Sequence, residues 1–104
     1  MKAIQSTEEF EKVISSPETV MVKFETTWCP DCKRLNMYID DIIKDFHFKW
    51  YSADRDKFPD LGREYQVLGI PSLLAFKNGE KKAHLRADDK SPEEIRDYLK
   101  TIEA

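Results

Sequence analysis

Two cysteines three residues apart, Cys29 and Cys32, constrain this chain more than any other feature. They follow an apolar run, Val20–Phe24, that is typical of a strand, and they precede apolar residues at the three- and four-residue spacing of a helix. Cys29 is therefore predicted at the N-cap, with Pro30 at the first helical position, where its missing N–H costs nothing. The N–H groups of Asp31 and Cys32 then face the Cys29 sulfur and, with the helix dipole, favour a thiolate. A nucleophilic sulfur one turn from a second sulfur predicts a dithiol/disulfide switch.

Length and charge narrow the class of protein. A chain of 104 residues is long enough for one hydrophobic core, and we expect a single domain over residues 1–104. A net charge of −3 argues against nucleic-acid binding. No stretch has the apolar core of a signal peptide or the length to span a bilayer, so we expect a cytoplasmic protein that binds no membrane. In that reducing compartment a lone Cys-x-x-Cys is more often catalytic or metal-binding than a structural disulfide.

The remaining pattern alternates strands and helices. Serines followed three residues later by a glutamate, at Ser6 and Ser91, predict the starts of the first and last helices. Asn78-Gly79 is typical of a type I′ hairpin turn. We predict strands over 2–5, 19–25, 48–54, 73–76 and 82–86, and helices over 7–15, 30–45, 61–65 and from 92 onward. The order βαβαβαββα predicts an α/β fold, a mixed central β-sheet flanked by helices on both faces.

These features together resemble the thioredoxin family. Trp28 directly before the cysteines, the pair Ile70-Pro71 and the hairpin over 76–79 stand in the family's order and spacing, and the resemblance covers nearly the whole chain. It implies a thioredoxin-like fold and a protein-disulfide reductase. By that resemblance Cys29 is the nucleophile and Cys32 the resolving thiol.

The resemblance also implies a docking groove and partners. Pro71 matches the family's cis-proline opposite the dithiol, and Gly69, Ile70 and the face of Trp28 match the groove that binds substrate. The implied partners are client proteins that contain disulfides and an upstream electron donor, a thioredoxin reductase. We expect a monomer that needs no cofactor or metal of its own.

Four positions depart from the family's pattern. The residues between the cysteines are Pro30-Asp31 where Gly-Pro is commonest, and Met37 replaces a helix-kinking proline. Lys23 stands where thioredoxins usually bury a carboxylate, and Trp50 where a lysine commonly partners that carboxylate. With Trp28, we expect Pro30, Asp31 and Lys23 to tune the active site. Asp31 should oppose the Cys29 thiolate while its charge suits the helix start.

Lys23 has two interpretations that the sequence leaves open. A neutral Lys23 amine can take the proton from Cys32, and a charged one can favour the Cys32 thiolate electrostatically. Alternatively Lys23 pairs with an acid such as Glu25 or Asp54 and only stabilises the fold, because an unpaired buried ammonium is costly. Glu25 is itself an alternative base.

A second class of function stays open beside the reductase. The chain can be a thioredoxin-fold binding module or metal carrier without redox turnover. Metal sites of zinc or iron–sulfur type usually need four ligands, whereas this chain offers two thiols, and His47 and His84 lack ligand spacing. Reduction of insulin disulfides discriminates between the two classes.

Overall fold

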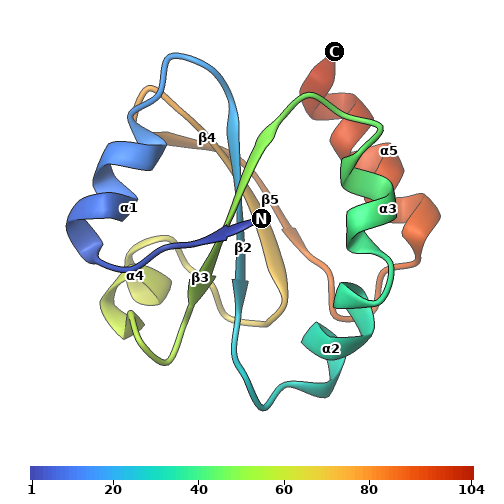
Figure 1. Cartoon of the computed structure of the whole chain (residues 1–104), viewed down its shortest axis with the longest axis horizontal. Coiled ribbons are helices and arrows are strands. Elements are labelled where there is room, and N and C mark those ends of the chain that lie inside the picture. Colours follow the sequence, from blue (N-terminus) through green and yellow to red (C-terminus); the bar gives the residue numbers. More distant parts are fainter.

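A five-stranded sheet with the order β1-β3-β2-β4-β5 separates two layers of helices (Figure 1). The computed structural model describes all of residues 1–104. The strands are β1 (Lys2–Ala3), β2 (Val20–Glu25), β3 (Lys49–Asp54), β4 (Ser72–Lys77) and β5 (Glu80–Arg86). The strands β1, β3 and β2 run parallel, and β4 is antiparallel to both β2 and β5. The predicted mixed sheet is confirmed.

The helices divide between the two faces of this sheet (Figure 1). One layer holds α1 (Thr7–Ile14) and α4 (Pro59–Glu64), and the other holds α2 (Pro30–Asn36), α3 (Ile39–Ile43) and α5 (Pro92–Glu103). None of them combines the length and apolarity needed to cross a membrane. The predicted caps are present, since Ser6 Oγ accepts the Glu9 N–H at 3.0 Å and Ser91 forms a full capping box with Glu94.

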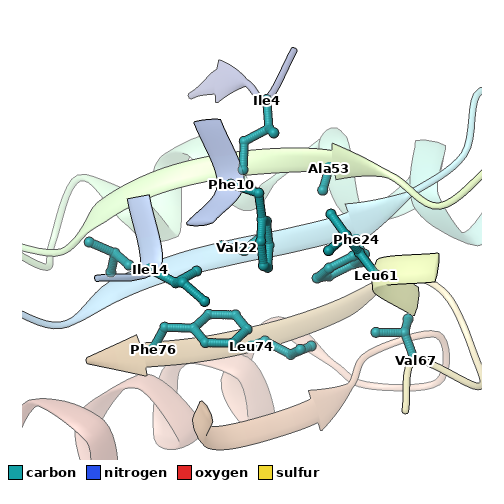
Figure 2. Packing of buried hydrophobic residues seen from close by; sticks show 11 residues of the cluster. Ile4, Phe10, Ile14, Val22, Phe24, Ala53, Leu61, Val67, Leu74 and Phe76 are labelled. Atoms are coloured by element: carbon teal, nitrogen blue, oxygen red, sulfur yellow. The ribbon is translucent and has the colours of Figure 1, made fainter. Parts of the chain in front are cut away.

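The central strand β2 is buried on both faces, as its apolar run predicts. Val22 and Phe24 contribute to the core beneath α1 and α4, whereas Met21 packs into the core beneath α2, α3 and α5. Figure 2 shows the first core, where Phe10 meets Phe24 and Phe76 edge to face, with ring centroids 6.1 and 5.6 Å apart. Because β2 is fixed from both sides, the segment that follows its carboxyl end starts from a rigid position.

The continuous helix predicted over 30–45 was wrong, because the structure divides it into α2 and α3. The N–H groups of Met37 and Tyr38 bond to carbonyls three residues back, and Tyr38 leaves the helical region with φ −134°. The Tyr38 side chain packs against the second core, and its hydroxyl donates to the Lys90 carbonyl at 3.4 Å. These contacts hold the break, although neither proline nor glycine occurs there.

The hairpin between β4 and β5 follows its sequence signal. Asn78 and Gly79 both have positive φ, 55° and 82°, as a type I′ turn requires. The predicted hairpin is therefore confirmed, and β5 begins at Glu80, two residues earlier than expected.

We expect Phe10→Ala to lower the free energy of unfolding by about 3–5 kcal/mol, because it leaves a cavity among fully buried rings. Urea denaturation followed by far-ultraviolet circular dichroism measures the change. The matched control is Met37→Ala, whose side chain is 84% exposed and should change stability by less than about 0.5 kcal/mol. Equal effects of the two substitutions would contradict the description of this core.

Candidate active site

The dithiol lies at the start of α2, directly after the segment that connects β2 to this helix. Cys29 is the N-cap of α2, with extended backbone (φ −79°, ψ 115°), and Pro30 occupies the first turn. The Cys29 Sγ accepts the Cys32 N–H at 3.1 Å, while the N–H of Asp31, also predicted to face it, makes no such bond. Both thiols are free and buried, with 4% of Cys29 and 1% of Cys32 exposed. The structure thus brings the two sulfurs together at the start of a helix.

The environment of Cys32 favours its protonated form. Burial is the largest cause, followed by the hydrogen bond and charge of Cys29 and by the charge of Glu25, and together they raise the pKa of Cys32 to about 12. A backbone hydrogen bond from Thr26 acts in the opposite direction. At neutral pH Cys32 is therefore a thiol, and it needs a proton acceptor before it can attack a disulfide.

The Ile70-Pro71 segment faces the dithiol. Its peptide bond is cis, and the Ile70 carbonyl oxygen lies 3.9 Å from Cys29 Sγ, within reach of a weak S–H donor. Gly69 precedes it, and the Arg86 guanidinium fills the space that a Cβ at this position would need. The predicted cis bond and its place beside Cys29 are confirmed.

Trp28 borders the dithiol from the other side. Its side chain is 59% exposed, and its indole Nε1–H donates to Asp56 Oδ2 at 2.7 Å. Asp56 follows β3 in a turn and was not among the predicted site residues, because nothing in its local sequence marks an indole acceptor. This bond fixes the indole while leaving its surface accessible.

Lys23 is paired rather than free. Its Nζ lies 3.1 Å from Glu25 Oε1, and it also donates to Asn36 Oδ1, while Asn36 Nδ2 donates to Glu25 Oε1 at 3.2 Å. The Lys23 side chain is buried and Glu25 is partly exposed. Of the two interpretations, the geometry favours pairing, with Glu25 as the acid. Asn36 was not among the predicted site residues, although it stands four residues after Cys32 on the same helix face.

The neighbour of Lys23 on β3 is Ser52, which stands opposite it in the parallel register. Trp50 stands opposite Met21 and is buried in the second core. The residue opposite Lys23 is therefore Ser52, and Trp50 is not its direct neighbour across the strands. The other departure, Asp31, forms a surface ion pair with Arg34 at 3.3 Å.

A polar pocket of about 470 Å³ opens beside Cys32. Glu25, Asn36 and Asp54 line it together with Cys32, and Thr26 contributes a buried hydroxyl that has no partner within the protein. The carboxylates and the resolving thiol thus share one solvent-connected space.

Comparison with known proteins agrees with this geometry. The family model named Thioredoxin matches residues 2–101. The chain belongs to the thioredoxin family. Thioredoxin M4, chloroplastic, from Arabidopsis thaliana is 36% identical over 73 residues, which is 68% of this chain and 38% of that protein. Thioredoxin from Buchnera aphidicola is 37% identical over 70 residues, 65% of this chain and 64% of that one. The match thus spans less than two thirds of these curated family members.

Solved structures of the family share the fold. Thioredoxin of Malassezia sympodialis superposes with a TM-score of 0.87 at 24% identity, covering 99% of this chain and 93% of that one. Plasmodium falciparum thioredoxin gives 0.87 at 22% identity, covering 97% of this chain and 98% of its own. The thioredoxin-like fold predicted for this family member is confirmed.

We expect limited alkylation of the reduced protein near neutral pH to modify Cys29 before Cys32. The raised pKa of Cys32 keeps it protonated, and only a thiolate reacts rapidly with iodoacetamide. Peptide mass spectrometry after a short exposure identifies the labelled residue. Full labelling after denaturation provides the control, and preferential labelling of Cys32 would overturn the assignment.

Proposed function

We propose that this thioredoxin family member is a protein-disulfide reductase that works by dithiol exchange. The single observation that carries the proposal is the Cys29–Cys32 pair at the start of α2 facing a cis-proline segment. Family membership supports the same activity and favours it over the binding-module or metal-carrier alternative. Cys29 is the nucleophile, and Cys32 is the resolving thiol.

The exchange proceeds in two displacements. The Cys29 thiolate attacks one sulfur of a client disulfide, forming a mixed disulfide and releasing the other client sulfur as a thiolate. The Cys32 thiolate then attacks Cys29 Sγ, which breaks the mixed disulfide and releases the second client thiolate. Both client thiolates take up protons, so the client gains two electrons while Cys29 and Cys32 become a disulfide.

The client segment docks along Gly69, Ile70 and Pro71, against the exposed face of Trp28. The backbone groups of a strand-like client segment can bond to the backbone at Ile70, next to the sulfur that reacts. The indole adds apolar contact area, and its bond to Asp56 holds it in place before the client arrives. Pro30 occupies the first turn of the helix. Asp31 pairs with Arg34 and so reduces the positive charge beside the dithiol.

Glu25 accepts the proton that Cys32 must lose. Its carboxylate acts on Cys32 electrostatically and shares the polar pocket with it, so a proton can pass directly or through water. Lys23 and Asn36 hold that carboxylate in position. Lys23 is thus a positioning residue, and Glu25 supplies the base from a neighbouring position on β2.

The partners follow from the chemistry. Client proteins with accessible disulfides are the substrates, and a thioredoxin reductase restores the dithiol. The monomeric state and the cytoplasmic location stay predictions, since the names of five relatives place those proteins in chloroplasts.

Reduction of insulin disulfides by dithiothreitol tests the activity. We expect the wild-type protein to accelerate precipitation of the insulin B chain and Cys29→Ser to abolish the acceleration. Cys32→Ser should instead accumulate a mixed disulfide with the client, because resolution is blocked. A wild-type protein without activity, or trapping by Cys29→Ser rather than by Cys32→Ser, would contradict the proposal.

We expect Glu25→Gln to slow the resolving step by about 10²–10⁴-fold near neutral pH, the usual loss when a general base is removed. Stopped-flow release of client from a preformed mixed disulfide measures this step. The loss should shrink as the pH rises, because hydroxide then deprotonates Cys32, whose pKa is raised to about 12.

Asp54→Asn is the matched control for that substitution. Asp54 lines the same pocket, but its Oδ1 accepts the backbone N–H groups of Asp56 and Lys57 at 2.8 and 3.3 Å, and an asparagine oxygen can do the same. A slow resolving step in this variant but not in Glu25→Gln would identify Asp54 as the base instead.

A further inference from the structure

A groove of about 350 Å³ lies beside Trp28, and it shares no lining residue with the polar pocket. We call it the Arg55 groove, and it is lined by Arg55, Asp56, Pro59, Gly62, Arg63, Val67 and Leu68. Two of its lining residues connect it to the site. Asp56 holds the Trp28 indole, and Leu68 directly precedes the Gly69-Ile70 segment that faces Cys29.

Arg55 is the cation that this groove leaves without a partner. The carboxylate that lines the groove, Asp56, accepts the indole N–H, and the second cation of the groove, Arg63, pairs with Asp60. Arg55 makes no side-chain hydrogen bond or ion pair, although its backbone N–H donates to the Glu25 carbonyl at 2.9 Å. A guanidinium without a counter-charge can bind a carboxylate through two parallel hydrogen bonds.

The side chain of Arg55 is directed by a glycine. A Cβ at Gly62 would lie 3.0 Å from Arg55 Cγ and 3.4 Å from Cδ, so the bare backbone of α4 gives the aliphatic stem room to pack. The stem is half-buried, which limits the rotamers that the guanidinium can sample. Less conformational entropy is therefore lost when a ligand binds.

Leu68 supplies an apolar contact next to this cation. It is 86% exposed, the largest exposed fraction among the large hydrophobic side chains that lie on the surface. Gln66, with φ 60°, begins a tight turn that the Leu68 N–H closes by donating to the Gln66 carbonyl at 3.0 Å. The turn directs Leu68 away from the core while Val67 is buried in it. Covering the exposed Leu68 side chain with an apolar group of a partner lowers the free energy of the complex.

We propose that the Arg55 groove binds an acidic stretch of the client, with a client Asp or Glu carboxylate paired to Arg55 and a client aliphatic side chain over Leu68. The inference rests on the proposed reductase function, because the groove adjoins the surface on which the client's reacting cysteine docks. It assigns a substrate preference to the site: disulfides whose flanking sequence carries a carboxylate on the Trp28 side.

The test uses synthetic disulfide peptides in which glutamate or glutamine is placed in turn at each position flanking the reacting cysteine. At the position that reaches Arg55, we expect the glutamate peptide to have a kcat/KM about tenfold above its glutamine counterpart, equivalent to roughly 1.4 kcal/mol. Arg55→Met keeps the aliphatic stem over Gly62 and should bring this ratio to about one. Arg55→Lys should restore part of it, since it keeps the charge but loses the paired hydrogen bonds.

Arg63→Gln is the matched control in the same groove. Arg63 is already neutralised by Asp60, so the glutamate preference should persist in this variant. Loss of the preference in Arg63→Gln but not in Arg55→Met would overturn the assignment to Arg55. Equal kcat/KM for all glutamate and glutamine peptides with the wild-type protein would overturn the proposal itself.

Calorimetry with serine-for-cysteine peptides separates this inference from the reductase function. If no peptide is reduced, the proposed function fails, but Kd values for the glutamate and glutamine versions still test the groove. Tighter binding of the glutamate version, lost in Arg55→Met, supports the proposal. Equal Kd values would contradict it.

Discussion

The ion pair between Lys23 and Glu25 is the interaction on which the centre of this structure depends. It sits on β2, the strand that both cores clamp, and Lys23 is 5% exposed there. Loss of the Glu25 carboxylate would leave the buried Lys23 ammonium without its counter-charge, which is costly. Asn36 joins the pair to α2, so the same interaction links the central strand to the helix that carries both cysteines. Fold stability and placement of the base beside Cys32 thus depend on one cluster.

Much of this arrangement is readable from local sequence. The apolar run of β2, the N-terminal proline of α2 and the Asn-Gly turn each act within a few residues, so spacing and residue type suffice to predict them. The start of α2 at Cys29 followed directly from such signals, and with it the contact between Cys29 and the Cys32 N–H.

The predictions were wrong or incomplete where contacts between residues far apart in the sequence determine the local structure. The break at Tyr38 is held by packing against the core and by the carbonyl of Lys90, 52 residues later, which helical periodicity cannot reveal. The neighbour of Lys23 depends on the register of β3 against β2, and a shift of two residues keeps the same face but changes the partner. Lys23 also donates to Asn36, a residue of another element that spacing along β2 does not reveal.

The packing of Arg86 against Gly69 limits which substitutions this surface accepts. Arg86 is fixed by its ion pair with Asp88, at 3.0 Å, and it occupies the volume above Gly69. A larger residue at position 69 therefore requires the exposed Arg86 side chain to move and to leave its contact with Asp88. Positions 55 and 68 carry no such constraint from a paired charge. Substitutions that alter client choice are therefore expected to disturb the surface less at the groove than at the segment beside the cysteines.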